Sequence, residues 1–454
     1  MTPSTSLARR MVQAVRAYTM QQLSPEVVAK VKTALLDMLS CAFEAQDLPW
    51  SQQAIAIATR THGDAHIVGT PLRVPFTEAA FVNAILGHGL VREDMHTGSV
   101  SHLGVVVLPT LLALAESKKV SGQEFILAAV CGYEAGCAVG RAVMDQENVR
   151  QYRPTGITGP IGAAAAGSRL LSLSEDASVS SLGFAANTTV GLNEWPYSGG
   201  DEMFFHVGFA ARNAVTSVEL AEQGARASET SLDGQAGLFA ALRRQHKIPE
   251  VTLFTRERPE ILEVYHKPAP ACNYAQTATQ LAQTLAREDG VSAADIIAIK
   301  VKATAAAVGY PGCNYAGPFT KTLQAKMSIH FCVAAALSRG VIEEANYRNL
   351  SDPEINRLAA ITTVEIDPAL TAAYPAQQGA EVIVTLLNGR TVRRALADVV
   401  PATPDQIRTR FRAAAEKVLG AEATAAAERF IDTLDQQPDA GALATLLSCK
   451  STNS

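Results

Sequence analysis

The chain has 454 residues, of which 48% are hydrophobic, 18% are charged and 6% are aromatic, and its formal net charge is −5. At about 150 residues per domain, this length predicts two or three domains, and a chain of this size buries enough surface for a substantial core. Intrinsic disorder is excluded, because it requires few apolar residues and a high net charge. A nucleic-acid-binding module is excluded as well, because 39 Lys and Arg against 44 Asp and Glu leave no basic excess.

The apolar segments indicate no membrane partner. The most apolar of them, residues 103–115, is interrupted by Pro109 and is shorter than the roughly 20 residues that a membrane-spanning helix needs. The first residues run into Arg9 and Arg10 without an apolar segment behind them, so we expect no signal peptide and a cytoplasmic protein. Seven cysteines without a Cys-x-x-Cys pair are typical of reduced thiols rather than of a disulfide framework or a structural zinc site.

The first 250 residues are predicted to be helical. Ser24 followed by Pro25 predicts a helix start, because a capping side chain precedes a proline at the first helical position. Two buried helices are expected at residues 108–117 and 123–143. A Gly/Ala-rich helix at 159–171 is expected to pack tightly, because small residues let two backbones approach closely, and it carries neither a phosphate-loop nor a dinucleotide motif.

The pattern changes near residue 290. Alternating apolar and polar residues predict strands, and Asn388-Gly389 between two such runs predicts a hairpin with a two-residue loop. Residues 403–406 have the form of a capping box that begins the last helices. The predicted strands are residues 296–303, 361–366, 382–387 and 390–396. We therefore predict a mainly α fold, with a large all-helical domain at residues 1–264 and 401–454 and a smaller α+β lid domain at residues 265–400.

The densest polar cluster lies at residues 88–102, between two apolar helices. It contains His88, His96 and His102 together with Glu93 and Asp94. Loops held by rigid helices commonly carry catalytic groups, and neighbouring imidazoles and carboxylates suit general acid–base work. A metal site built from these histidines and Asp94 lacks any familiar ligand spacing. The alternative is a solvated loop in which an Asp caps a helix.

Further polar groups flank predicted helices and the domain boundary. Tyr152 and Arg153 precede the Gly/Ala-rich helix, where backbone N–H groups and a guanidinium make a natural carboxylate pocket; the alternative is an ordinary proline-led helix start. His206 lies inside another predicted helix, and Lys267 and Cys272 flank a proline-rich turn near the domain boundary, where clefts form. Their alternatives are a buried, satisfied histidine and a surface lysine.

Taken together, these stretches resemble the MmgE/PrpD family, which includes 2-methylcitrate dehydratase, cis-aconitate decarboxylase and iminodisuccinate epimerase. The matching stretches are residues 36–42, 79–84, 93–94, 102, 107–116, 132–134, 154–156 and 206–211, and Lys267-Pro268 with Cys272. The resemblance implies a large helical domain, a smaller α+β domain and a cleft between them. It also implies a homodimer that needs no metal or organic cofactor and that acts on small di- or tricarboxylates.

The chain is a divergent member by this comparison. The family pattern H-x-x-D-[FY]-D-D-T is altered in the first loop, and basic or neutral residues replace several acid–base groups. The departures are Val91 for Asp, Arg92 for the aromatic residue, Glu93 for Asp, Met95 for Thr, Arg153 for His, Met203 for Lys and Gln276 for His. Two arginines are gained, so an anionic pocket is still expected.

The leading hypothesis is a cofactor-independent lyase that removes a proton next to a carboxylate of a small di- or tricarboxylate and then releases water or carbon dioxide. Preorganised cations must stabilise the charge that develops. The predicted catalytic residues are Glu93, Asp94, His96, His102, Lys267 and Tyr315, and the predicted substrate-binding residues are Arg92, Tyr152, Arg153, His206, Cys272 and Gln276. The alternatives are an epimerase, with His102 opposed by Tyr315 or Lys267, and a non-catalytic polycarboxylate-binding protein.

Overall fold

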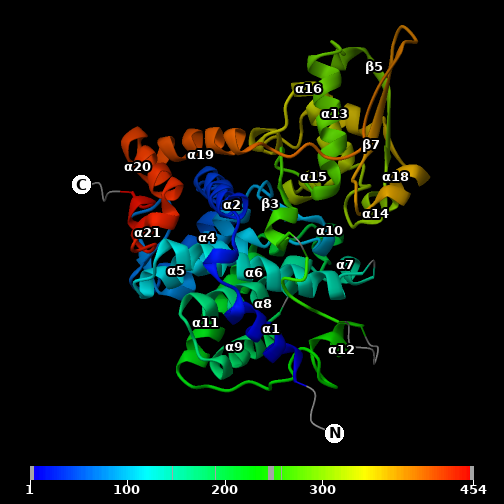
Figure 1. Cartoon of the computed structure of the whole chain (residues 1–454). Helices are drawn as coiled ribbons and strands as arrows, with labels where there is room; N and C mark the ends of the chain where they lie inside the picture. The colour runs from blue at the N-terminus through cyan, green and yellow to red at the C-terminus, as the bar shows by residue number, and fades with distance from the viewer. Residues whose placement is uncertain (1–4, 146, 190, 244–249, 257, 450–454) are drawn as a thin grey trace.

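The computed structural model describes residues 5–145, 147–189, 191–243, 250–256 and 258–449 as a helical domain that carries a smaller sheet-containing domain (Figure 1). The helical domain holds the N-terminal half of the chain, and the sheet lies in the smaller domain, at the top right of Figure 1. The N-terminal helices are α1 (Leu7–Ala17), α2 (Pro25–Glu44), α3 (Pro49–Ala58), α4 (Phe76–His88), α5 (Gly104–Ser117), α6 (Gly122–Val143), α7 (Asn148–Gln151), α8 (Pro154–Leu170), α9 (Glu175–Asn187), α10 (Trp195–Ser198), α11 (Glu202–Glu222) and α12 (Leu238–Arg243).

Local signals place these helices as predicted. The Ser24 side chain accepts a hydrogen bond from the Val27 backbone at 3.3 Å, which caps α2 with Pro25 at its first position. The Gly/Ala-rich helix α8 packs closely on α6, because a Cβ atom added at Gly162 would lie 2.7 Å from the Gly132 carbonyl. The expectation of tight backbone packing there is confirmed.

Helix α6, and not the segment at residues 103–115, is the best candidate for a membrane-spanning helix by length and composition. It is the one helix in the described ranges that is long and apolar enough to cross a membrane by length and composition. Its most apolar window is 89% buried inside the protein, mainly against α8. That burial is typical of a core helix, so the finding is weak evidence for a membrane span.

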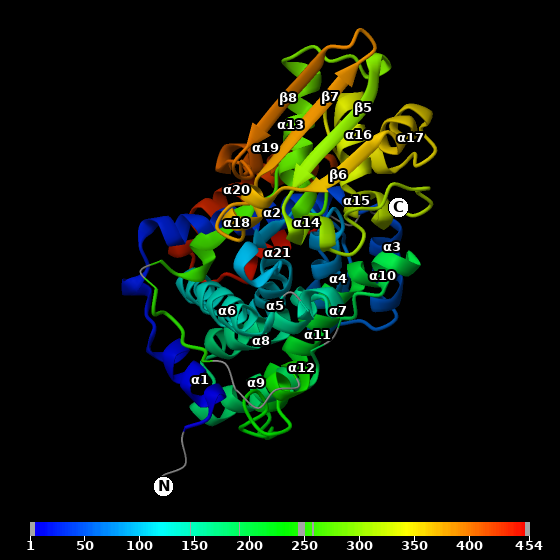
Figure 2. The ribbon, with the colours of Figure 1, turned by 90° about the vertical axis from the view of Figure 1, so that its right-hand side faces the viewer.

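The smaller domain is built on a four-stranded sheet in the order β6-β5-β7-β8. Strand β5 is parallel to β6 and antiparallel to β7, and β7 is antiparallel to β8. Helices α13 and α16 lie on one face of this sheet (Figure 2). Along β7 buried and half-buried residues alternate, as in a strand with one face on a core. The strands are β5 (Ile296–Ala303), β6 (Thr362–Ile366), β7 (Ala380–Leu386) and β8 (Thr391–Leu396), and the helices are α13 (Gln276–Arg287), α14 (Ala305–Gly309), α15 (Thr322–Met327), α16 (Ile329–Arg339), α17 (Pro353–Ala360) and α18 (Pro368–Ala373).

The hairpin between β7 and β8 is confirmed, but its predicted two-residue loop is wrong. The Leu386 N–H donates to the Arg390 carbonyl at 2.9 Å, so residues 387–389 form a three-residue loop. A two-residue loop of the favoured type needs positive φ at both central residues. Within this described loop only Gly389 has positive φ, at 81°, which suits the longer loop.

The last helices return to the helical domain (Figure 1). They are α19 (Pro404–Leu419), α20 (Ala421–Asp432) and α21 (Ala442–Leu446). The Thr403 side chain accepts from the Gln406 backbone in the predicted capping box. Helix α19 packs against α2, with the Phe43 and Phe411 rings 6.0 Å apart.

A short strand pair ties the polar loop to the start of the second domain. Strand β3 (Asp94–His96) pairs antiparallel with β4 (Val264–His266), and Asp94 lies opposite His266. A second two-stranded pair joins β1 (Ala65–His66) to β2 (Arg73–Val74). The predicted domain boundary after residue 264 falls inside β4, and the division of the chain stays a prediction.

Candidate active site

A narrow cavity of about 20 Å³ lies where the two domains meet. It brings together His102 before α5, Arg153 at the start of α8, and Lys267 and Cys272 after β4. The other lining residues are Val91, Met95, Val100, Met203, Asn273, Tyr274, Tyr310 and Met327. A second space shares Val100, Tyr274 and Tyr310 with this cavity and includes Ala305 and Tyr374 of the second domain. Four of the residues predicted from separate stretches therefore line one cavity.

The loop that follows α4 holds the lining residue Val91 in a strained backbone conformation. Val91 has φ 60°, in the left-handed region, where a β-branched residue is an outlier that costs about 1–3 kcal/mol. In this conformation its carbonyl accepts a hydrogen bond from the Lys267 ammonium at 2.7 Å. The strain thus holds a backbone oxygen against a buried cation.

A buried chain of three side chains runs along this loop behind the cavity. The His88 Nδ1 atom lies 2.5 Å from the Glu93 Oε1 atom, and the His102 Nδ1 atom lies 3.0 Å from the same oxygen. Burial alone would raise the pKa of Glu93, but the two imidazoles hold it well below its usual range. Glu93 is therefore ionised and orients both rings.

The tautomer of His102 follows from its hydrogen bonds. Its Nδ1 atom also lies 2.8 Å from the Asp94 carbonyl oxygen, which only accepts, so the proton is on Nδ1. The Nε2 atom, with its lone pair, has no hydrogen-bond partner among the described side chains and backbone. Burial, followed by the charge of Lys267, lowers the pKa of His102 to about 3. The imidazole is neutral at pH 7 and can accept a proton at Nε2.

Two buried cations line the cavity without a carboxylate partner in the described part of the chain. The Lys267 side chain is fully buried and donates to the carbonyls of Val91 and Ala271, at 2.7 and 3.1 Å, which leaves one of its three N–H groups. Arg153 is 5% exposed; its Nη2 atom lies 3.3 Å from the His88 Nε2 atom, and its Nε–H makes no hydrogen bond. Burial lowers the pKa of Lys267 to about 8. Burying unpaired charge is costly, so both cations suit an anionic ligand.

The Asp94 carboxylate serves the scaffold rather than the cavity. It accepts hydrogen bonds from the Tyr133 hydroxyl and, at 3.2 Å, from the Gly104 backbone at the start of α5. This contact explains why α5 begins at Gly104, earlier than residue 108. Burial raises the pKa of Asp94 to about 6. The helix-capping Asp of the alternative matches this geometry, but the solvated loop does not, because Asp94 is 2% exposed. Only the Asp94 carbonyl contacts His102.

Arg92 points to another part of the domain junction. Its Nη2 atom pairs with the Glu44 carboxylate at 2.8 Å and lies 3.4 Å from the Ser40 hydroxyl, both on α2. It lines a wide cleft between α2, α13 and α19, together with residues such as Arg410. The structure therefore does not bring Arg92 to the cavity that holds Arg153 and Lys267.

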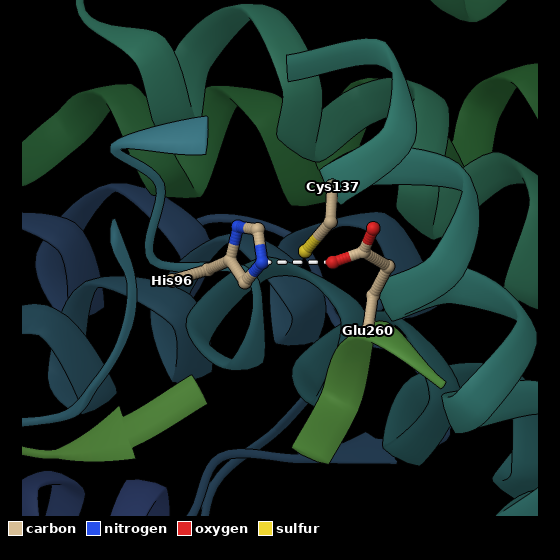
Figure 3. Close-up of side chains that lie close together, drawn as sticks. All are labelled: His96, Cys137 and Glu260. Carbon is tan, nitrogen blue, oxygen red and sulfur yellow. Dashed lines mark hydrogen bonds and ion pairs between the residues drawn. The ribbon is translucent and has the colours of Figure 1, made fainter. Parts of the chain in front are cut away.

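His96 belongs to a separate buried cluster. Figure 3 shows His96, Cys137 and Glu260 pointing toward one another, with their ligand-type atoms within 4.8 Å of one another. The Arg141 guanidinium donates to both Glu260 oxygens and lies 3.2 Å from the His96 Nε2 atom. Burial holds the pKa of the Cys137 thiol well above its usual range. A metal ion here would have to displace a guanidinium and deprotonate a buried thiol.

The remaining predicted residues do not line the cavity. The Gln276 amide donates to the carbonyls of Ala269 and Ala271, both at 2.9 Å, and shapes the turn that carries Cys272. The Tyr315 hydroxyl donates to the Pro318 carbonyl. His206 sits behind Arg153, where burial lowers the imidazole pKa to about 4, and Tyr152 forms an isolated β-bridge with Leu192. Their predicted catalytic and binding roles stay predictions.

Several lining residues carry no strong local signal. Asn273 and Tyr274 directly follow Cys272 and could have been included with it. Tyr310, whose pKa burial raises to about 12, lies in the second domain five residues before the predicted Tyr315, and the sequence does not show that it, rather than Tyr315, lines the cavity. His88 belongs to the polar cluster at residues 88–102, but only the fold places its ring between Glu93 and Arg153.

The fold and the cavity define a mainly helical two-domain protein with a cationic pocket at the domain junction. The MmgE/PrpD N-terminal domain matches residues 9–250, and the MmgE/PrpD C-terminal domain matches residues 269–436. The chain belongs to the MmgE/PrpD family, which confirms the resemblance and the mainly helical fold class.

Named relatives are similar at low identity. The chain is 24% identical to human cis-aconitate decarboxylase over 468 residues, 97% of this chain and 94% of the relative. It is 29% identical to cis-aconitate decarboxylase of Aspergillus terreus over 223 residues, 47% of this chain and 45% of the relative. It is also 29% identical to the cis-aconitate decarboxylase-like protein oryM of Aspergillus oryzae over 251 residues, 53% of this chain and 52% of the relative. The chain spans about half the length of these fungal relatives.

Proposed function

We propose that this protein is a cofactor-independent lyase that acts on a small carboxylate by removing a proton next to a carboxylate group. One observation carries the proposal. Two buried cations without a carboxylate partner in the described chain, Arg153 and Lys267, line the same cavity as the neutral imidazole of His102. The decarboxylase names of the relatives support a lyase and a carboxylate substrate.

In this mechanism the cations bind and the histidine transfers the proton. The Arg153 guanidinium and the remaining Lys267 N–H hold substrate carboxylates, and His102 Nε2 takes a proton from the adjacent carbon. In a dehydration the electron pair left on carbon forms the new double bond and expels the neighbouring hydroxyl group, which takes the proton from the His102 imidazolium and leaves as water. In a decarboxylation no C–H proton is removed first: the C–C bond breaks, carbon dioxide leaves, the bonding electrons stay on carbon, and His102, protonated from solvent, gives that carbon a proton. Preorganised cations stabilise the charge in both cases.

Glu93 holds His102 in the productive tautomer. Its carboxylate stabilises the imidazolium that forms when Nε2 takes the proton, because it lies 3.0 Å from Nδ1. This arrangement is the usual pairing of a base with an orienting carboxylate. Glu93 is a positioning residue, since it does not line the cavity.

The test follows protons and products by NMR in D₂O with a panel of small unsaturated and hydroxylated carboxylates. An alkene product or carbon dioxide is the expected result. Exchange with inversion and no new alkene would instead make the protein an epimerase. Binding without exchange or product for any panel member would make it a non-catalytic binding protein.

The His102→Gln variant tests the base directly. It should lower turnover by about 10²-fold or more, because a positioned base contributes about that much. His62→Gln is the matched control, because His62 is exposed and does not line the cavity. Near-normal turnover of a folded His102→Gln protein would overturn the assignment.

A further inference from the structure

The cavity lining has a second character besides its charge. Five aliphatic or thioether side chains, Val91, Met95, Val100, Met203 and Met327, line the same space as the two cations. All five are at most 9% exposed. They come from three separate segments, so the apolar lining is a property of the assembled cavity rather than of one strand or helix.

The charges of the lining set an upper limit on the anion. Arg153 and Lys267 are the two positively charged residues of the lining, and no carboxylate is found among the described residues that line the cavity. The adjoining space adds Arg150 but also Asp145, one charge of each sign. Two cations match two carboxylates. A third carboxylate would find no third cation in this lining, only neutral polar groups such as Asn273 and Tyr310 and the apolar side chains, and a buried charge without a counter-charge is strongly disfavoured.

We propose that the substrate carries at most two carboxylates together with an alkyl substituent that packs on the apolar lining, and that a tricarboxylate is excluded. This inference rests on the proposed function, because it concerns the ligand of the same cavity. The departures at Val91, Met95 and Met203 all lie on this lining. At each of these positions the side chain that faces the cavity is apolar.

A series of unreactive ligands that differ at one carbon measures this preference. Glutarate, 3-methylglutarate and tricarballylate share the same chain and carry hydrogen, methyl or carboxylate at carbon 3. Isothermal titration calorimetry at pH 7 should show 3-methylglutarate binding up to about fourfold tighter than glutarate, the gain for one buried CH₂ group. Tricarballylate should bind at least about tenfold more weakly than glutarate, because its third carboxylate is desolvated without a partner.

The Met203→Lys variant supplies the missing cation. It should strengthen tricarballylate binding about tenfold or more and weaken 3-methylglutarate, whereas Met203→Leu, which keeps the lining apolar, should retain the original order. Wild-type protein alone decides the question if the lysine variant does not fold. Tricarballylate binding as tightly as 3-methylglutarate would overturn this inference and leave the proposed carboxylate site intact. Failure of all three ligands to bind would instead overturn the proposed function.

Discussion

The ammonium of Lys267 gives a pH dependence whose direction can be derived from the structure. Burial lowers its pKa from 10.5 to about 8, and Glu93 only partly offsets that effect. Because kcat/KM reports the groups of the free enzyme, it should be level below about pH 7, fall to about half near pH 8 and then fall about tenfold per pH unit as Lys267 loses the charge that holds a carboxylate. Rate measurements from pH 6 to 10 with one substrate test this.

The same group makes stability change in the opposite direction. Its folded pKa lies below its unfolded pKa, so the unfolded chain binds more protons between pH 8 and 10.5. Lys267 therefore contributes about 3 kcal/mol to the unfolding free energy that is absent below pH 8 and is gained as the pH rises through this window. Denaturant unfolding measures the free energy of unfolding of the wild type and of Lys267→Met. The wild type should gain about 3 kcal/mol relative to the variant as the pH rises from 8 to 10.5.

Matched variants separate Lys267 from its neighbours. Lys119→Met removes an exposed lysine and should retain the break near pH 8. Cys272→Ser should retain it too; burial would raise the pKa of that thiol, but the Cys313 hydrogen bond and the Lys267 charge lower it. A kcat/KM that stays level to pH 10, or a break that survives in Lys267→Met, would refute the assignment.

Two further predictions concern the loop before α5. Asp94→Asn should leave turnover nearly unchanged, because the carboxylate faces Tyr133 and Gly104. Asp94→Ala should lower the free energy of unfolding by about 1–3 kcal/mol for each donor left unpaired. Kinetics and denaturant unfolding check both, and a large loss of turnover in folded Asp94→Asn would contradict the scaffold role. Val91→Gly should be more stable than Val91→Ala by about 1 kcal/mol, because φ is 60°; thermal unfolding that ranks alanine first would show that this backbone is not strained.

Much of the fold could be predicted because its signals are local. Ser24 and Thr403 cap their helices with their own side chains, and those contacts involve residues three positions away. The hairpin loop was harder, since a two- or three-residue loop depends on the twist and register of the sheet. The start of α5 depends on Asp94, ten residues upstream, whose reach the sequence does not show.

The site was predicted in part, and strand geometry explains the rest. Met95 lines the cavity, and successive side chains of a strand point to opposite faces. Asp94 and His96, its neighbours in β3, therefore face away, to Tyr133 and Glu260. If residues 94–96 are predicted as a strand, Asp94 and His96 fall on the face opposite Met95, so they are no longer expected in the same cavity as His102. Tyr310 is different, because only the packing of the second domain brings it to the cavity.

The low basicity of His102 results from burial and from the cations beside it. A base with a pKa of about 3 is far from the value near neutral pH that suits proton abstraction. Burial is the largest cause, and the charges of Lys267 and Arg153 add to it. A bound carboxylate offsets those charges, and in an apolar cavity the effect is weakly screened, so the pKa of His102 rises when an anion is held. We therefore expect His102 to be a stronger base beside a bound anion than without one, and the valine and methionine side chains of the cavity strengthen that coupling.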